Sequence, residues 1–345
     1  MEWKLSGEQE SYQQTLREWL VAVAGPEPVR AWFEAADPGP FNQRLLGDGW
    51  WGVGVTEDAG GQGGGVVELA LTAEELGRAA APSAAWLSSV LTVPATGRWG
   101  DTPSCWLTPA EGPPRVVDVA VDGDGLLTGT VPRVLGASSA TSFVVAVRGA
   151  SAVELRLVDD SDAVTIDLRK LLDRSRDVAD VTLRGARSTL LEAGADAALA
   201  DAASLSAVLV AADALGASQR MLDMTVAYSL QRRQFGVPIG SFQAVKHTAA
   251  TMEVMVEASR SAVYFAAASI EGSDVDSRLH AAAVKAQVTA DASIAADAAL
   301  TVHGAIGYTW EYDLQLFYKR AKLDEYLCGD PHWWNEQIAI GLALA

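Results

Sequence analysis

The chain has 345 residues with 44 acidic and 26 basic side chains, which gives a formal net charge of −18. This charge disfavours a nucleic-acid partner, whose binding surfaces are basic, and the four histidines and two cysteines show no metal-ligand spacing. The first residues (MEWKLSGEQESYQQ) lack the basic start and apolar core of a signal peptide, and no apolar run near about 18 residues stands out, so we expect a cytoplasmic protein without a membrane span.

The first third of the chain reads as helices joined by irregular segments. Residues 7–24 form a predicted helix that Ser6 caps, and residues 41–52 and 66–80 form two more. A glycine cluster at 60–65 lies between these two helices. It does not fit the G-x-G-x-x-G spacing and no strand clearly precedes it, so we interpret it as a flexible turn and not as a phosphate-binding loop.

From about Cys105 to Leu191 the pattern changes to short β-type runs, separated by Gly, Asp and Ser turns. Strands at this spacing without intervening helices predict a small barrel or sandwich of about 90 residues. The clearest runs are residues 116–121, 142–147, 152–158 and 178–183.

From Asp196 onward the chain is alanine-rich, and apolar residues recur at helical spacing. This pattern favours a four-helix bundle, because small residues let helices approach closely. The first long helix is expected to include Arg232 and Arg233 in its last turn, where positive charge complements the helix dipole. Glycines and a proline at 236–240 end it, and a second helix is expected near Ser241.

Two segments of this C-terminal part carry a family resemblance. Residues 232–247, RRQFGVPIGSFQAVKH, resemble the R-x-Q-F-G-x-P-I-G-x-F-Q-A-V motif of the acyl-CoA dehydrogenases. Residues 301–322, TVHGAIGYTWEYDLQLFYKRAK, resemble the family's Q-x-H-G-G-I-G-x-T-W-E-x-D-L-x-L-x-x-K-R-A. Weaker similarities occur at 49–65, at EELGRA (74–79) and at DRSR (173–176), which resembles the D-x-T-R that closes the family's β domain.

The resemblance implies an α+β fold with three domains: an N-terminal helical domain (1–102), a middle β-barrel or sandwich (103–195) and a C-terminal four-helix bundle (196–345). It also implies α,β-dehydrogenation of an acyl-CoA, in which a carboxylate removes a proton from Cα and hydride passes from Cβ to FAD. In the family the FAD lies between two subunits. The β domain of one chain holds the isoalloxazine, and the bundle of its neighbour holds the pyrophosphate and adenine.

The residues that match the pyrophosphate and adenosine half of the cofactor site are largely present. Arg232 matches the arginine that meets the pyrophosphate, and Gln243 matches a glutamine that binds the adenosine part. Thr301 and Ala305 depart from the family's Gln and Gly. The full set implied by the resemblance is Arg232, Gln234, Phe235, Gln243, Thr301, Val302, His303, Gly304 and Ala305.

The flavin-facing half departs further from the family. Where the family has L-T-E-P-x-x-G-S-D, residues 104–117 read SCWLTPAEGPPRVV. The catalytic Glu is absent from both of its known positions, which are Cys328 and Ser206 here. Glu325 and Asp330 are nearby acids that favour a solvated role over a catalytic one.

The resemblance therefore implies the base-lacking subunit of an α2β2 acyl-CoA dehydrogenase, with a catalytic partner subunit, an acyl-CoA substrate that is possibly bulky or steroid-derived, and a flavoprotein electron acceptor. Two alternatives stay open. One is a self-sufficient homo-oligomer that uses Glu325 or Asp330 as the base, and the other is a cofactor-free scaffold. Of the remaining motif residues, His247 is expected to hydrogen-bond within the bundle. A structural corner is expected from Trp310, Glu311 and Asp313, with Glu311 a weak candidate acid.

Overall fold

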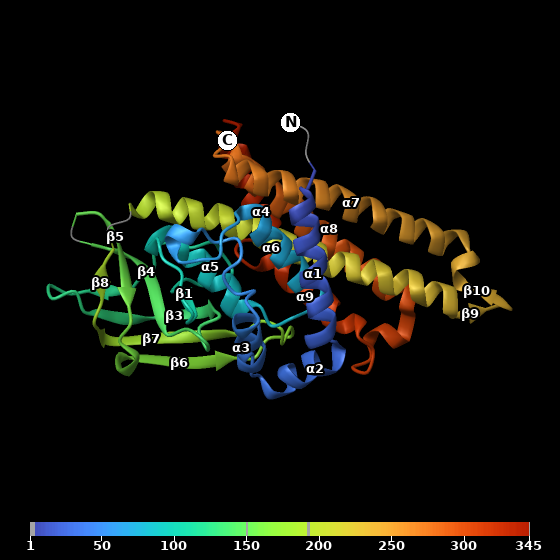
Figure 1. Cartoon of the computed structure of the whole chain (residues 1–345), viewed down its shortest axis with the longest axis horizontal. Helices are drawn as coiled ribbons and strands as arrows, with labels where there is room; N and C mark the ends of the chain where they lie inside the picture. Colours follow the sequence, from blue (N-terminus) through green and yellow to red (C-terminus); the bar gives the residue numbers. More distant parts are fainter. Residues whose placement is uncertain (1–3, 150, 192–193, 345) are drawn as a thin grey trace.

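The computed structural model describes residues 4–344 except 150, 192 and 193, and it arranges them as N-terminal helices, two four-stranded β-sheets and a long helical bundle with a small β-hairpin (Figure 1). Residues 1–3 of the expected first domain, residues 192 and 193 near the expected boundary at 195, and residue 345 lie outside this description. The N-terminal helices are α1 (Gly7–Val23), α2 (Pro26–Ala35), α3 (Gly39–Gly47), α4 (Val66–Arg78) and α5 (Ala84–Thr96).

The predicted N-terminal helices are confirmed with changed ends. Ser6 caps α1 through a capping box, in which the Ser6 hydroxyl accepts from the Gln9 amide and the Gln9 side chain accepts from the Ser6 amide. The helix predicted over 41–52 ends at Gly47, and α2 and α5 are additional helices. The glycine cluster at 60–65 forms a loop before α4, as expected.

The middle part consists of two four-stranded sheets, in the orders β1-β4-β5-β8 and β2-β3-β7-β6, which confirms the predicted β domain. Alternate side chains of the strands meet in a separate apolar core between the sheets. The strand predicted over 116–121 shrinks to its last two residues. The strands are β1 (Ser104–Trp106), β2 (Ala120–Val121), β3 (Leu127–Leu135), β4 (Ser142–Arg148), β5 (Val153–Val158), β6 (Val164–Arg169), β7 (Val178–Ala186) and β8 (Thr189–Leu190).

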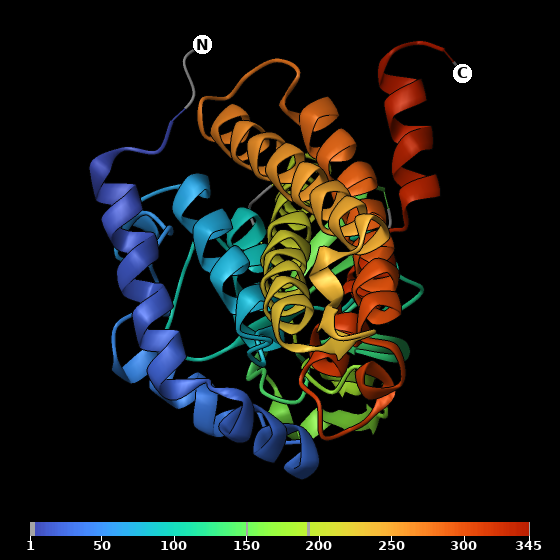
Figure 2. The same ribbon diagram turned by 90° about the vertical axis from the view of Figure 1, so that its right-hand side faces the viewer.

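The C-terminal part is a bundle of long antiparallel helices, flanked by the N-terminal helices on one side and by α10 on the other (Figure 2). A small hairpin of β9 (Arg233–Gln234) and β10 (Val237–Pro238) joins α6 to α7 at the far end of the bundle. The helices are α6 (Ala195–Gln231), α7 (Gln243–Glu271), α8 (Ser277–His303), α9 (Leu314–Tyr326) and α10 (Pro331–Gly341).

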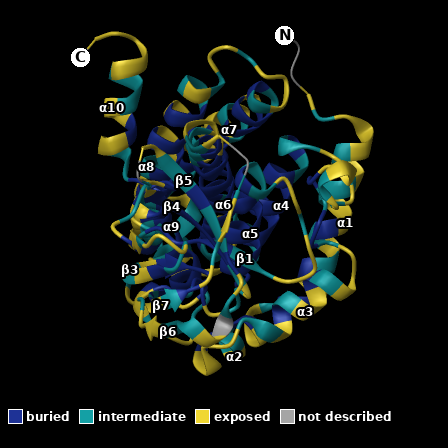
Figure 3. Cartoon of the chain, turned by 90° about the vertical axis from the view of Figure 1, so that its left-hand side faces the viewer, coloured by how far each residue is buried: buried dark blue, intermediate teal, exposed yellow. Residues whose placement is uncertain are grey.

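The expectation that no apolar run reaches about 18 residues is wrong for α6, because this helix is long and apolar enough to cross a membrane. However, 78% of its apolar window is buried inside this chain, where α4, α5 and the bundle helices pack around it (Figure 3). Gly216 lets α4 approach closely, since a Cβ there would lie 1.8 Å from the Glu74 carbonyl oxygen. The helix is therefore the core element that the N-terminal and C-terminal parts share.

A buried charge cluster joins all three parts and orients α9. The Arg320 guanidinium donates to both carboxylate oxygens of Asp213 at 2.6 Å, and to the Ala81 carbonyl and the Ser83 hydroxyl of the N-terminal part. Arg176, from the DRSR segment of the β domain, lies 3.0 Å from Asp213 and 3.1 Å from Asp324. Arg320 of the K-R-A segment and Arg176 of the DRSR segment thus have a structural role, because their ion pairs hold α9, the helix that leads to Cys328.

Candidate functional site

The two positions where the family places its base lie side by side in the fold. Ser206, on α6, lies beside the thiol of Cys328, which follows α9, and the Ser206 hydroxyl donates to the Ala203 carbonyl at 2.8 Å. Both side chains are buried. Burial raises the pKa of the Cys328 thiol, so the neutral form is favoured and this group is a poor proton acceptor.

A β-domain loop closes directly over this position. The Cys328 amide donates to the Ala110 carbonyl at 2.7 Å, and the Trp106 indole fills the adjacent space, donating to the Leu91 carbonyl at 2.6 Å. The cavity that remains between Cys328, Trp106 and Thr108 has a volume of about 20 Å³, roughly that of one water. The flavin-facing segment of this chain therefore packs as protein interior.

Lys285 of α8 holds the turn that carries Cys328. Its ammonium is buried and donates to the carbonyls of Asp324 at 3.0 Å and Gly329 at 2.7 Å. Burial lowers the pKa of Lys285 to about 8. Sequence reasoning missed this residue, although a lysine within the alanine-rich stretch 281–300 was a signal for a specific buried contact.

Of the two nearby acids, Asp330 has a structural role. Asp330 is the N-cap of α10, and its carboxylate accepts from the Trp333 amide at 2.7 Å. Glu325 lies in α9, its backbone carbonyl accepts from Lys285 at 3.4 Å, and its side chain makes no hydrogen bond or ion pair within the described part of the chain. Within the described residues, no group of His, Cys, Asp and Glu is arranged to hold a metal ion.

At the far end of the bundle, the α6–α7 hairpin presents the first matched motif to solvent. Arg232 is the C-cap of α6 in an extended conformation and Arg233 begins β9, so the expectation that both arginines belong to the last helical turn is wrong. Phe235 and Gly236 both have positive φ at the turn, and the Phe235 ring is 92% exposed. Its edge-on neighbour is Phe242, with ring centroids 6.1 Å apart.

The exposed residues of this end include Gln234 and Gln243 beside Arg232. None of the three makes a recorded side-chain hydrogen bond or ion pair within the described part of the chain, so their polar groups are free to meet a ligand or a second chain. Apolar side chains are also exposed here, and they belong to α6, the hairpin and the segment after α8: Val226, Leu230, Phe235, Val237, Phe242, Ile306 and Tyr308.

The second matched motif ends α8 at the same end of the bundle. Thr301 and Ala305 are exposed, Val302 and Gly304 are half-buried, and His303 is buried. The His303 ring stacks on Tyr228 with centroids 4.5 Å apart, and its Nδ1 lies 2.7 Å from the Ala299 carbonyl. Burial lowers the pKa of His303, which favours the neutral imidazole as a packing group.

The expected corner after this motif is a contact to the N-terminal part. The Asp313 carboxylate pairs with Arg30 of α2 at 2.5 Å, and Arg30 also donates to the Glu311 carbonyl at 2.6 Å. The Glu311 side chain is exposed, and Trp310 lies under the Lys319 ammonium, 3.5 Å from the ring centroid. His247 is exposed on α7, and no hydrogen bond of its side chain is recorded.

These two regions fit the two halves of a flavin dinucleotide unequally. Within the described part of the chain, the bundle end offers an unpaired guanidinium, two exposed amides and an exposed aromatic ring, which suit a pyrophosphate and an adenosine group. The cavity beside Cys328, which the Ala110 contact closes, measures about 20 Å³ and is too small for a flavin ring. A helical domain, a β sandwich and a long-helix bundle in this order form the arrangement that the resemblance to the acyl-CoA dehydrogenases implies.

Comparisons with known proteins agree with this class. The acyl-CoA dehydrogenase N-terminal domain profile matches residues 6–102, and the C-terminal domain profile matches residues 192–340. Acyl-CoA dehydrogenase IpdE2 of Mycolicibacterium smegmatis is 32% identical over 95% of this chain and 96% of its own length. Acyl-CoA dehydrogenase FadE34 of Mycobacterium tuberculosis is also 32% identical over 97% of this chain, which spans about half (48%) of that relative's length.

Among solved structures, the ChsE4-ChsE5 complex from Mycobacterium tuberculosis has a similar chain, with a TM-score of 0.87 and 24% identity over the full length of both chains. The chain therefore belongs to the acyl-CoA dehydrogenase family, and FAD is the cofactor of this family.

Proposed function

We propose that this chain is the base-lacking subunit of a hetero-oligomeric, FAD-dependent acyl-CoA dehydrogenase. In this proposal it supplies the pyrophosphate and adenosine half of a flavin site to a catalytic partner subunit, in an α2β2 assembly in the cytoplasm. The observation that carries the proposal is that Ser206 and Cys328 lie side by side at the two positions where the family has its base, under a closed β-domain loop.

The first support is chemical. Dehydrogenation of an acyl thioester begins with a carboxylate that accepts the α-proton, and a neutral thiol with a raised pKa does not replace it. The nearby carboxylate of Asp330 has a different role, because it caps α10. In this proposal a carboxylate of the partner subunit would remove the α-proton, and FAD, when bound, would supply the hydride acceptor.

The second support is the exposed bundle end. The exposed Phe235 ring is unfavourable in water and would be stabilised by contact with another chain or a ligand. The exposed Arg232, which has no ion pair among the described residues, is suited to bind the phosphates of a dinucleotide held by another chain. Arg232 binds the pyrophosphate, Phe235 and Gln243 orient the adenosine part, and the apolar side chains around them exclude water. The electron acceptor in this proposal is a second flavoprotein.

The substrate we propose is a bulky, steroid-derived acyl-CoA. The support is similarity in fold: a structure described as a steroid ACAD, from the pair Tcur3481-Tcur3483, matches with a TM-score of 0.85 and 24% identity over 98% of both chains. The substrate's position would be determined by the partner subunit, because the corresponding region of this chain is filled by Trp106.

The test is flavin retention in a complex with a co-expressed catalytic subunit. Arg232→Ala should lower the FAD-to-complex ratio by about tenfold or more while the two chains still co-purify, since a charge-assisted phosphate contact contributes about 1.5–3 kcal/mol. Arg44→Ala is the matched control, because Arg44 is an exposed helical arginine on α3 that makes no recorded ion pair. Full flavin occupancy in the Arg232→Ala complex would refute this role.

The same complex separates the two alternatives. In a self-sufficient enzyme, Glu325→Gln or Asp330→Asn would abolish turnover with little change in assembly. In our account, turnover survives both changes, and Asp330→Asn affects mainly the stability of α10. A cofactor-free scaffold would assemble with its partner and show the same flavin content with or without Arg232.

A further inference from the structure

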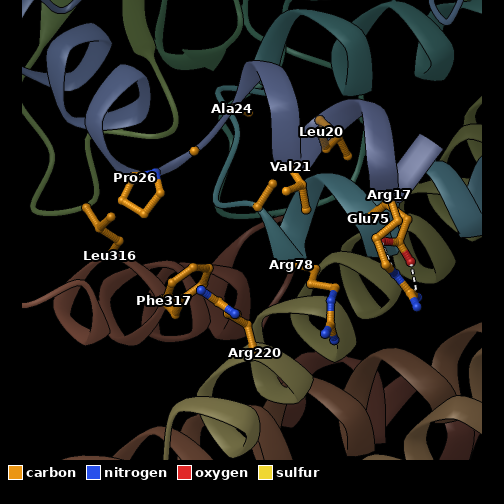
Figure 4. Close-up of a pocket in the computed structure, with 12 residues that line it drawn as sticks. Arg17, Leu20, Val21, Ala24, Pro26, Glu75, Arg78, Arg220, Leu316 and Phe317 are labelled. Carbon is orange, nitrogen blue, oxygen red and sulfur yellow. Dashed lines mark hydrogen bonds and ion pairs between the residues drawn. The ribbon is translucent and has the colours of Figure 1, made fainter. Parts of the chain in front are cut away.

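A second cavity lies away from both regions described above, at the seam between the N-terminal helices and the bundle. It has a volume of about 270 Å³ and opens between the end of α1, the end of α4, the middle of α6 and the start of α9 (Figure 4). It shares no lining residue with the small cavity at Cys328. Its walls come from Arg17, Leu20, Val21, Ala24, Gly25, Pro26, Glu75, Arg78, Ala79, Arg220, Leu316 and Phe317.

Three guanidiniums line this cavity, and two of them are neutralised within the chain. Arg17 pairs with the buried Glu75 at 2.6 Å, and Arg78 pairs with Asp223 at 2.6 Å. The third, Arg220, is half-buried, and no carboxylate pairs with it among the described residues. The cavity therefore carries one uncompensated positive charge, in a chain whose net charge is −18.

The remaining wall is apolar. Leu20 and Val21 of α1 lie on one side, Leu316 and Phe317 of α9 lie on the other, and the Arg220 side chain extends toward Phe317 (Figure 4). Pockets that hold drug-sized ligands measure about 300–1,000 Å³, so this cavity suits a smaller molecule. An apolar slot with one charged group fixes both the size and the polarity of its ligand.

We propose that this cavity binds a small amphipathic carboxylate, with its carboxylate on the Arg220 guanidinium and its hydrocarbon part between α1 and α9. A planar guanidinium matches a carboxylate in a bidentate fork, and the single unpaired cation calls for one negative charge. The hydrocarbon part is stabilised by removal of its apolar surface from water.

Octanoate is a suitable probe, and 1-octanol is the neutral molecule of the same length. Titration calorimetry on the purified chain at constant ionic strength should show octanoate binding at least tenfold more tightly than 1-octanol. Arg220→Gln should weaken octanoate binding about 10- to 100-fold, the range of a charge-assisted hydrogen bond. The control Arg44→Gln changes an exposed helical arginine outside the cavity and should bind as the wild type does.

A second pair of variants tests the apolar wall without touching the charge. Val21 is 76% exposed on α1, so Val21→Trp should fold normally, cover the cavity and abolish octanoate binding. Val254→Trp, at a 69% exposed position on α7, is the matched control and should leave binding unchanged. Equal affinity for octanoate and 1-octanol, or unchanged octanoate binding by Arg220→Gln or Val21→Trp, would overturn the proposal.

The outcome is independent of the flavin experiments. Arg232 does not line this cavity, so Arg232→Ala should bind octanoate as the wild type does. Failure of octanoate to bind would overturn the proposal for this cavity and leave the proposed role of the bundle end untouched.

Discussion

Replacing Arg320 with Met tests whether the buried charge cluster joins the three parts of the fold. Arg320 is fully buried and donates to Asp213, the Ala81 carbonyl and Ser83. Methionine fills a similar volume but leaves Asp213 and Asp324 to share the single cation of Arg176. Removal of one partner from a buried ion pair costs about 3–5 kcal/mol, so Arg320→Met should lower the free energy of unfolding by this amount at pH 7.

Urea unfolding followed by circular dichroism measures this loss by linear extrapolation. Asp213→Asn removes the opposing charge, so the double variant should be more stable than the sum of the two single losses predicts, with a coupling of about 1–3 kcal/mol. Arg320→Lys keeps the charge but cannot make the fork to Asp213, and it should lose an intermediate amount. A loss below about 1 kcal/mol for Arg320→Met, or strict additivity in the double variant, would refute the reasoning.

The remaining predictions concern packing and pH. Gly216→Ala should destabilise the chain by about 3 kcal/mol or more in urea, because its Cβ would meet the Glu74 carbonyl, whereas Gly123→Ala, with open space around it, should change stability by less than about 1 kcal/mol. The pKa of His303 is lowered in the fold, so as the pH falls below about 6.5 the unfolded chain binds a proton before the folded chain does. The stability of the wild type should therefore fall more steeply from about pH 7 to 5.5 than that of His303→Gln, and equal slopes would contradict this. The pKa of Lys285 is lowered to about 8, so between about pH 8 and 10 the folded chain has released this proton while the unfolded chain still holds it. Over this range the wild type should gain stability relative to Lys285→Met, and parallel pH profiles of the two proteins would contradict this prediction.

Local signals predicted the elements that local chemistry determines. The cap at Ser6 and the short β-type runs around 142–158 were readable because a helix end or a strand needs only its neighbours in sequence. The hairpin after α6 was misread at Arg233, since charge in a last helical turn and charge at a strand start look alike without the backbone. The helices α2 and α5 went unrecognised, and α5 contains Pro94.

Long-range partnerships could not be read from the sequence. The contact between Ser206 and Cys328 depends on how α6 crosses the end of α9, and the Arg320 cluster joins residues more than a hundred positions apart. Polar residues within apolar runs, such as Asp213 in α6 and Lys285 in α8, are the sequence signals of such contacts. The motif residues around Arg232 and Thr301 do meet at one end of the bundle, and their role there remains a prediction.

The flavin content of the purified chain tests the central claim most directly. If the proposed role is correct, the chain alone should contain close to no FAD and show no acyl-CoA dehydrogenation, because in that proposal it supplies only the adenosine half of the cofactor site. The same preparation made with its catalytic partner should contain FAD and turn over. One FAD per polypeptide in the chain alone, together with normal turnover, would contradict the account.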